Sequence, residues 1–189
     1  MRNFYSFGRE ALRKSHYHLM YKSDISIHTL QPRDCLTISQ AFAAQGWNKP
    51  VSQYERYLEH QNAQTRKVLV AETKGEFAGY LVIQWNSDYL PFKAKGIPEI
   101  IDLNVLQKFQ RNKVATVLMD EAERQIKQVS PVAGIGFGLT KDYGPAQIMY
   151  IKRGYLPNGR GIVKASKSLE YGQRVTIDDD LVMYLTKLL

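Results

Sequence analysis

Hydrophobic and polar positions change period several times along this chain, and each change predicts a new element of secondary structure. In residues 24–30 apolar side chains alternate with polar ones, as on a half-buried strand. The next segment predicts a helix that begins near Asp34 and breaks at Gly46. Its apolar surface is supplied by Leu36, Ile38, Phe42 and Ala43. Ser52 and Glu55 match a capping box and predict the start of a second helix.

The middle of the chain predicts a β-hairpin followed by an irregular segment. Residues 67–72 and 77–85 have the composition of strands, and the connection Thr73-Lys74-Gly75-Glu76 is short and contains glycine, as hairpin turns do. The segment from Asn86 to Pro98 is long enough for a loop that faces a substrate, an ordinary connection being the alternative. Together with the first strand, this pattern favours a mixed sheet.

Residues 99–127 hold the most informative pattern. An apolar strand (100–105) leads into a polar, basic loop (107–113) and then into an amphipathic helix. The apolar positions of this helix are spaced by three and four, at Val114, Val117, Leu118, Ala122 and Ile126. The N–H groups and positive dipole end of the helix point at the loop, where Lys108, Arg111 and Lys113 add charge. We expect a ligand that carries a polyphosphate to bind there.

The last third of the chain predicts a strand, a short helix and a final strand. Residues 133–139 form a glycine-rich strand, whose small side chains would let a neighbouring backbone or ligand approach closely. Its glycines do not form a dinucleotide fingerprint, because no helix starts immediately behind them. Pro145 suits the first turn of a helix that ends at Gly154, and residues 178–188 alternate as a strand does.

Length and composition indicate a single soluble domain. The chain has 189 residues, and no apolar run approaches the roughly 18 residues of a membrane helix. Cys35 is the only cysteine, so no intramolecular disulfide forms; a buried structural thiol and a cytoplasmic location are expected. The four histidines lack the spacing of metal ligands, and we expect no metal.

The formal net charge of +8 is compatible with nucleic acid, an acidic partner or an anionic cofactor. Basic residues are spread along the sequence without a nucleic-acid-binding motif, which disfavours nucleic acid. Residues 1–23 form a basic N-terminal extension, interpreted as a tail or short helix packed on the domain, with a targeting peptide as the alternative. We assign residues 24–189 to the domain itself.

Two blocks resemble the signatures of the GNAT superfamily, the acetyl-CoA-dependent N-acetyltransferases. Gln110-Arg111-Asn112-Lys113-Val114-Ala115 is similar to Q/R-x-x-G-x-G/A, with Lys113 in place of the first glycine. Ala146-x-x-x-Tyr150-x-x-x-Gly154-Tyr155 is similar to the end of the family's last conserved helix, with Tyr143 where the family usually has asparagine. The resemblance covers roughly residues 24–189 and implies an α/β GNAT fold, a twisted mixed central β-sheet flanked by helices.

The resemblance also implies where acetyl-CoA binds. It lies in the splay between the strand that ends at Val105 and the strand that ends at Leu139. Leu103 offers a backbone N–H to the thioester carbonyl, and Val105 contacts the pantetheine arm through its main chain. The pyrophosphate is held by Gln110, Arg111, Asn112, Lys113, Val114, Ala115 and Thr116. A residue in the first helical turn has ordinary helical angles, so we expect Lys113 to be accommodated without glycine and to pair with phosphate.

The same resemblance assigns the chemistry. Tyr150 falls on the general acid that protonates the coenzyme A thiolate. Glu99, eleven residues before Gln110, is the candidate base, and Asp102 on the same strand is its competitor. The acetyl group passes directly to the amine, so Cys35 is not expected to carry it.

The resulting expectation is N-acetylation of a primary amine of an unidentified small molecule or peptide. The alternative is a non-catalytic relative that binds coenzyme A, a protein partner or an acidic polymer. Acetyl-CoA and the amine are the expected partners, without membrane or nucleic acid, and a homodimer is compatible with this assignment. Residues that could shape the acceptor pocket, or simply pack in the core, are Trp47, Trp85, Tyr89 and Phe92.

Overall fold

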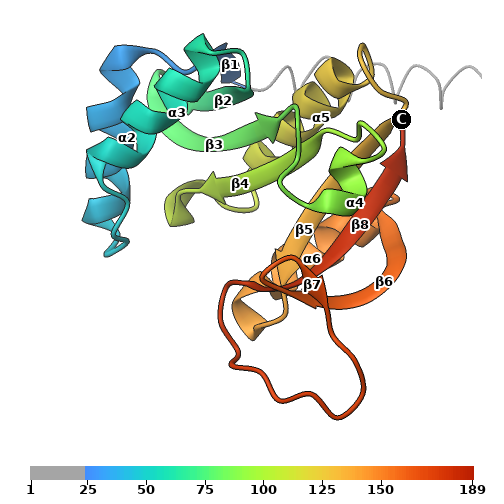
Figure 1. Ribbon diagram of the computed structural model, residues 1–189. Helices are drawn as coiled ribbons and strands as arrows, with labels where there is room; N and C mark the ends of the chain where they lie inside the picture. Colours follow the sequence, from blue (N-terminus) through green and yellow to red (C-terminus); the bar gives the residue numbers. More distant parts are fainter. Residues whose placement is uncertain (1–23) are drawn as a thin grey trace, which may run out of the picture.

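A computed structural model describes residues 24–189, and the predicted extension of residues 1–23 lies outside them. The described chain forms a twisted, mixed, eight-stranded sheet flanked by helices, which confirms the predicted architecture (Figure 1). The strands are β1 (Ile25–Thr29), β2 (Arg66–Thr73), β3 (Glu76–Gln84), β4 (Glu99–Val105), β5 (Val132–Gly138), β6 (Leu156–Lys164), β7 (Lys167–Ser168) and β8 (Leu181–Leu188). The helices are α2 (Pro32–Ala44), α3 (Val51–Asn62), α4 (Leu90–Lys93), α5 (Val114–Ile126) and α6 (Gly144–Lys152), with short 3-10 turns at Gln107–Phe109 and Lys141–Tyr143.

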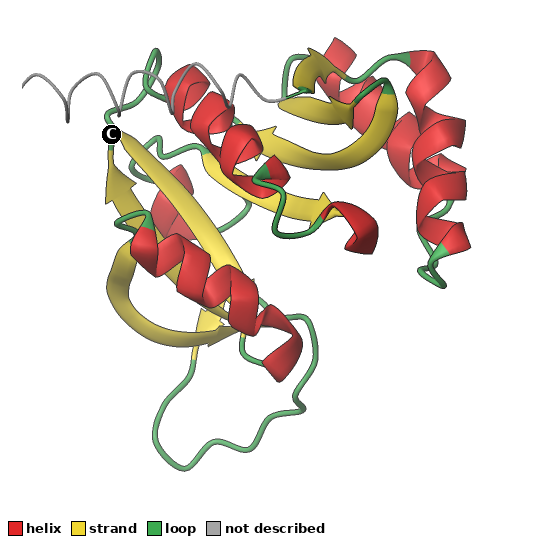
Figure 2. Ribbon diagram, turned by 180° about the vertical axis from the view of Figure 1, so that it is seen from behind, coloured by secondary structure: helices red, strands yellow, loops and turns green. Residues whose placement is uncertain are grey.

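The first half of the sheet is buried on both faces. Strands β1, β2 and β3 pair antiparallel, and the β2–β3 pair is the predicted hairpin. Val68 and Val70 of β2 pack with α2 and α3, whereas Leu69 packs with α5 on the opposite face. Figures 1 and 2 show α2 and α3 on one face and α5 on the other. Because both faces are covered, β3 is almost continuously apolar and buried, without an alternating pattern.

The sheet opens between β4 and β5. The strand order is β1-β2-β3-β4-β5-β8-β6-β7, and among the described residues only β4 and β5 pair in parallel. Their pairing is limited to Glu99 with Gly134 and Ile100 with Ile135, after which the strands diverge. The predicted splay between the ends of these two strands is therefore present, and it creates a space within the sheet.

Helix starts differ from the sequence prediction at one place. Helix α3 begins at Val51, and its N-cap is Pro50 with an extended backbone (φ −69°, ψ 153°), without a side-chain capping bond. Ser52 therefore lies inside the first turn, and the capping box predicted for Ser52 and Glu55 is wrong. A carboxylate does cap α2, since the backbone N–H of Gln31 donates to Asp34 over 2.7 Å.

The glycines of β5 make room for aromatic rings. A Cβ atom at Gly134 would lie 2.4 Å from a ring carbon of Phe92, and one at Gly138 would lie 2.5 Å from the ring of Tyr143. Aromatic side chains therefore use the space beside these two glycines. Gly136 and Gly138 also line a cavity, so the expected close approach of a ligand to this strand stays a prediction. Residue Gly154, just beyond α6, has φ +88°, the left-handed conformation expected at a helix C-terminus.

Within residues 24–189, no helix combines the length and the hydrophobicity that a membrane crossing requires. The connection between β7 and β8, residues 169–180, projects from the sheet at the lower end of Figure 1. Its last residues return toward the opening between β4 and β5, where Asp179 lines a cavity.

Candidate active site

A cavity of about 680 Å³ occupies the splay between β4 and β5. Its walls come from β4, β5, β8, α6 and the connection between α2 and α3. Four of the predicted site residues line it together, namely Glu99, Asp102, Leu103 and Tyr150. The fold therefore brings predicted residues of strand β4 and helix α6 to one cavity, although these elements are far apart along the chain.

Glu99 lies at the base of the splay with its carboxyl group buried. The hydroxyl of Ser87 donates to Glu99 Oε2 over 2.5 Å, and the same hydroxyl oxygen accepts the backbone N–H of Tyr89 over 3.0 Å. Burial raises the pKa of Glu99 from 4.5 to about 7, against the smaller lowering effect of the Ser87 hydrogen bond. A carboxyl with this pKa is able to accept a proton near neutral pH.

Asp102 sits on a β-bulge of β4. Its φ is +48°, in the left-handed region, and the pairing of β4 with β3 shifts between Tyr80–Asn104 and Val82–Ile101. Two residues of β4, Asp102 and Leu103, thus oppose one residue of β3. Aspartate tolerates this conformation better than most side chains do.

Hydrogen bonds occupy both oxygens of Asp102. Oδ2 accepts from the hydroxyls of Tyr80 and Tyr57 over 2.6 and 2.7 Å and from Gln53 Nε2 over 3.1 Å. Oδ1 accepts from Asn104 Nδ2 over 2.6 Å and from Lys49 Nζ over 3.4 Å. Because a carboxylate offers about four acceptor positions, Asp102 has no spare one for a substrate proton. The carboxylate ties α3 and the α2–α3 connection to the bulge.

Tyr150 projects from α6 into the cavity and is 6% exposed. Its ring packs near Phe137 and Tyr155, with centroid distances of 6.5 and 6.2 Å. Burial raises the pKa of its phenol, which therefore stays protonated at neutral pH. Within residues 24–189 the hydroxyl has no hydrogen-bond partner, so it is available to donate to a ligand.

The basic loop lies beyond the far end of β4 and does not line the cavity. Helix α5 begins at Val114, and the backbone N–H groups of residues 114–116 have no acceptor within the helix. The first intrahelical bond of this turn runs from Val117 N–H to the Lys113 carbonyl over 3.0 Å. Lys108 forms an ion pair with Glu76, which reduces the charge that this lysine contributes to the loop.

The backbone of this loop corrects one expectation. Lys113 is the N-cap of α5 with φ +64°, and Arg111 has φ +63°, so the expectation that Lys113 adopts ordinary helical angles is wrong. Asn112, between them, has no positive φ. Successive N–H groups in such an alternation form a concave anion-binding nest. Glycine suits a left-handed position without steric cost, which explains why the motif places glycine at position 113.

We expect Lys113→Gly to be more stable than Lys113→Ala by about 1 kcal/mol, because only the alanine retains the left-handed strain. Both variants remove the lysine side chain and its contacts, so their difference isolates the backbone contribution. Urea denaturation of the two proteins measures it. Equal midpoints and slopes would show that position 113 is not strained.

Leu103 and Val105 follow the bulge in different surroundings. Leu103 lines the cavity, whereas Val105 pairs with Gly79 at the end of the strand and does not line it. A bulge leaves one residue of the longer strand without a regular ladder partner. The register shift therefore falls where Leu103 lines the cavity.

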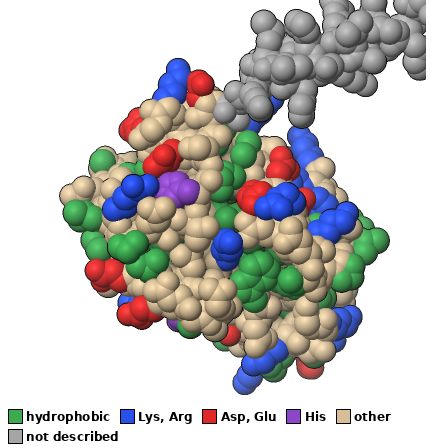
Figure 3. All heavy atoms as spheres, turned by 90° about the horizontal axis from the view of Figure 1, so that it is seen from above, with side chains coloured by type: hydrophobic (Ala, Val, Ile, Leu, Met, Phe, Trp, Pro, Cys, Tyr) green, Lys and Arg blue, Asp and Glu red, His purple; other side chains and the backbone are tan. Residues whose placement is uncertain are grey.

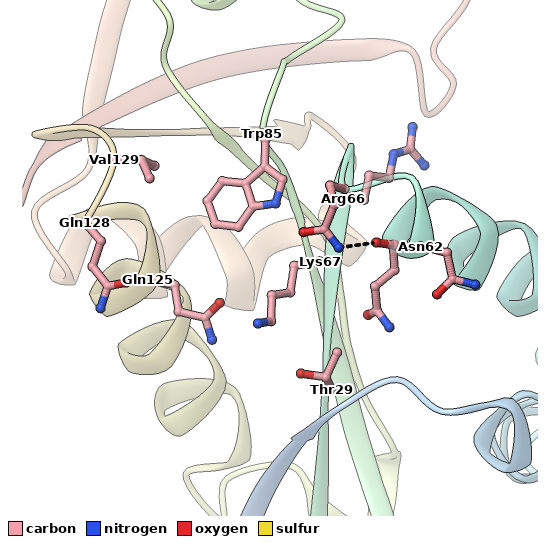
Figure 4. A pocket seen from close by; sticks show the side chains of 10 residues that line it. Thr29, Asn62, Arg66, Lys67, Trp85, Gln125, Gln128 and Val129 are labelled. Carbon is pink, nitrogen blue, oxygen red and sulfur yellow. Dashed lines mark hydrogen bonds between the residues drawn. The ribbon is translucent and has the colours of Figure 1, made fainter.

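Of the aromatic residues expected near the pocket, only Trp47 lines this cavity. Tyr89 and Phe92 pack in a buried cluster with Tyr184, on whose ring Tyr89 stacks at 3.7 Å. Trp85 lines a separate hollow of about 420 Å³, which it shares with Lys67 (Figure 4). This second hollow holds none of the predicted catalytic residues.

Sequence reasoning missed the partners that hold the site together. They are Lys49, Gln53, Tyr57, Tyr80, Asn104 and Ser87. Among these partners, only Tyr80 and Asn104 could have been predicted to lie together, because they are paired across β3 and β4 once the register of the two strands is known. Cys35 is buried, as expected for a structural thiol.

The remaining chemistry of the described residues is sparse. Residues 24–189 contain no group of three His, Cys, Asp or Glu side chains arranged to hold a metal ion, and His16 and His18 lie outside this range. On the face shown in Figure 3, lysine and arginine side chains are interspersed with acidic and apolar ones and do not form one basic patch.

Comparison with known proteins adds independent findings. The sequence model of the acetyltransferase (GNAT) family matches residues 33–155. An N-acetyltransferase from Staphylococcus aureus Mu50 is similar with a TM-score of 0.65 at 11% identity, over 88% of this chain and 99% of that chain. A ribosomal-protein-alanine N-acetyltransferase from Brucella melitensis has a TM-score of 0.62 at 18% identity, over 87% and 99% of the two chains. A GNAT family acetyltransferase from Elizabethkingia anophelis, solved with acetyl-CoA bound, has a TM-score of 0.57 at 19% identity, over 89% and 100%.

These structural similarities concern the fold, and comparison with curated proteins gives no significant match.

Proposed function

The chain belongs to the GNAT acetyltransferase family, and from this premise we propose that it transfers an acetyl group from acetyl-CoA directly to a primary amine. The supporting observation is the cavity in the β4–β5 splay. It combines a buried carboxyl of pKa about 7, Glu99, with a protonated, unpartnered phenol, Tyr150. Amide formation from a thioester requires one group that accepts a proton and one that donates a proton.

We assign the phosphate end of acetyl-CoA to the loop and first turn of α5. Arg111 and Lys113 supply positive charge, and the backbone N–H groups of residues 114–116 supply donors at the positive end of the helix dipole. Gln110 and Asn112 complete the segment. Val105 and Leu103 then lead along β4 to the cavity, where the thioester would lie.

The proposed reaction uses each of these groups once. Glu99 accepts a proton from the substrate ammonium, directly or through water, and the neutral amine attacks the thioester carbonyl carbon. The backbone N–H of Leu103 stabilises the oxyanion that forms. The C–S bond then breaks, and Tyr150 donates its proton to the departing thiolate. The acylated nitrogen loses its remaining extra proton to water, and water returns a proton to the Tyr150 phenolate. The products are the acetylated amine and free coenzyme A.

Glu99 is the better base of the two carboxylates. Both oxygens of Asp102 already accept hydrogen bonds, whereas Ser87 is the only side chain that donates to Glu99 among the described residues. We therefore give Asp102 a structural role in the bulge.

The pH dependence of kcat/KM tests the base. Glu99 accepts a proton only when ionised, and its pKa is about 7, so activity should fall as pH decreases through about 7. In Glu99→Gln, kcat/KM should drop roughly 10²- to 10³-fold. The decrease of kcat/KM near pH 7 should disappear from the pH profile, and a pH dependence that comes from the substrate ammonium should stay. Identical pH profiles in the two proteins would contradict this assignment.

Release of free thiol from acetyl-CoA across a panel of amines tests the function itself. We expect thiol release that depends on an added amine and yields the acetylated product by mass spectrometry. Binding of coenzyme A without thiol release from any amine would favour the non-catalytic alternative. Absence of coenzyme A uptake at millimolar ligand in calorimetry would overturn the proposal.

A further inference from the structure

The cavity is lined mainly by acidic side chains, whereas the chain as a whole is basic. The whole sequence has a formal net charge of +8. The charged side chains that line the cavity are nevertheless mostly acidic: Glu99, Asp102, Asp142, Asp179 and the single cation Lys49. The basic residues of the proposed phosphate site lie beyond the end of β4, outside this lining. The two proposed substrate regions therefore differ in charge.

Lys49 is already committed to Asp102. Its ammonium lies 3.4 Å from Asp102 Oδ1 and 3.1 Å from the hydroxyl of Tyr80, and only 17% of its side chain is exposed. The ammonium also lies 5.6 Å from the ring centroids of Phe42 and Tyr80. Lys49 therefore balances Asp102, and within residues 24–189 no lysine, arginine or histidine forms an ion pair with the other three carboxyl groups.

Asp142 and Asp179 form the outer acidic wall, and both are exposed at the rim. Among residues 24–189, neither forms an ion pair, and the hydroxyl of Tyr143 approaches Asp179 Oδ1 at 3.4 Å. Tyr143 comes from the turn before α6, and Asp179 comes from the connection before β8. Two separate segments thus bring exposed carboxylates, neither of them in an ion pair within the described residues, to the lining of this cavity.

Independent features of the same cavity indicate a ligand. Tyr150 lines the cavity with only 6% of its surface exposed, and its hydroxyl has no hydrogen-bond partner in the described part of the chain. The aromatic side chains Trp47, Tyr143 and Tyr184 also line the space, and such rings attract organic cations. The volume of about 680 Å³ lies in the range of small-molecule sites.

From this arrangement we infer that the acceptor is a small aliphatic diamine or polyamine, with at least one cationic group besides the amine that reacts. The inference rests on the proposed function and names the substrate class of the same cavity. The reacting nitrogen gives its proton to Glu99 and receives the acetyl group, while the second ammonium keeps its charge beside Asp142 and Asp179. The acidic mouth draws the polyamine in, and the basic loop draws the phosphates of coenzyme A.

The test compares acceptors that differ only in the second group. Diaminobutane, butylamine and aminobutanol have similar length, and only diaminobutane has two ammonium groups. We expect kcat/KM for diaminobutane to exceed that of the other two by roughly 5-fold, which corresponds to one favourable exposed ion pair, and this advantage to shrink at high salt.

Variants at the rim locate the effect. The double variant Asp142→Asn with Asp179→Asn should raise KM for diaminobutane roughly 3- to 5-fold, and should change KM for butylamine, which lacks the second ammonium, by less than about twofold. Glu59→Gln removes the same kind of charge from the exposed face of α3, away from the cavity, and should leave both acceptors unaffected. Calorimetric binding of diaminobutane without acetyl-CoA supplies a readout that does not require turnover.

The outcomes separate the two proposals. Equal use of butylamine and diaminobutane would overturn the polyamine inference while acetyl transfer stands. Diaminobutane binding that weakens in the rim variant, with no thiol release from any amine, would show a polyamine-binding site at the rim, and it would overturn acetyl transfer and with it the acceptor role. A lysine-containing peptide that is acetylated more efficiently than diaminobutane would overturn the small-molecule class.

Discussion

Replacing Tyr150 with phenylalanine is expected to lower kcat roughly 10²- to 10⁴-fold, with little change in KM for acetyl-CoA. The substitution removes one hydroxyl from a ring that packs near Phe137 and Tyr155, so the cavity keeps its shape. The thiolate of coenzyme A would then leave without a proton donor beside it. Steady-state thiol release at saturating acetyl-CoA measures this effect.

Tyr155→Phe provides the matched control. Tyr155 is a fully buried neighbour of Tyr150 and does not line the cavity, and its hydroxyl has no hydrogen-bond partner within residues 24–189. We expect kcat within about twofold of the wild type in this variant, because no transition-state interaction is lost. If Tyr150→Phe behaved in the same way, the proton would have to come from another group or from water.

Elements with a strong local pattern could be predicted from the sequence. The β2–β3 hairpin has alternating or continuous apolar strands and a glycine at the turn, and α5 has a complete apolar stripe. Strand β6 was missed because Pro157, Gly159 and Gly161 interrupt it and most of its side chains are exposed. An exposed strand near a sheet edge has no buried face to impose a period of two.

The wrong capping prediction arose from a similar local ambiguity. A serine followed by glutamate three residues later matched at positions 52 and 55, but Pro50 precedes them and occupies the cap itself. Proline fixes the extended entry to a helix without any side-chain bond. The proline was therefore the better marker of the helix start.

The backbone at Lys113 shows a different limit. The motif placed glycine there, and a glycine position often indicates a positive φ. Ordinary helical angles were predicted for Lys113, but the structure gives this residue a φ of +64°. The glycine of the motif at this position therefore indicated a positive φ, and the prediction considered only the charge of the lysine side chain.

The surroundings of the site could not be predicted because they depend on distant segments. Lys49 and Asp102 are separated by 53 residues, and Tyr57 and Asp102 by 45. Local periodicity places each of these residues on its own element, but it does not set the packing of α3 against the β4 bulge. Two carboxylates on one strand therefore looked equivalent in sequence and differ in the fold by burial and by hydrogen bonding.

Replacement of Asp102 with alanine is expected to reduce the free energy of unfolding by about 2–4 kcal/mol. The carboxylate accepts from two tyrosine hydroxyls, two amide groups and the ammonium of Lys49, all of which lose their acceptor. Alanine at φ +48° adds left-handed strain of roughly 1 kcal/mol. Urea denaturation and kcat/KM for the acceptor should both reveal the loss, because the bulge also positions Leu103.

Two further variants separate the backbone from the carboxylate. Asp102→Gly removes the same acceptor but tolerates the positive φ, so it should be more stable than Asp102→Ala by about 1 kcal/mol. Asp102→Asn keeps one acceptor oxygen and tolerates the positive φ, but its amide N–H group faces donors and finds no acceptor among them. The stability of Asp102→Asn should therefore lie between that of Asp102→Gly and that of the wild type. If all three variants unfolded at the wild-type urea concentration, the network around Asp102 would not be what holds α3 on the bulge. If kcat/KM fell without any change in stability, the Asp102 carboxylate would act on the substrate, and Asp102 would compete with Glu99 for the role of the base.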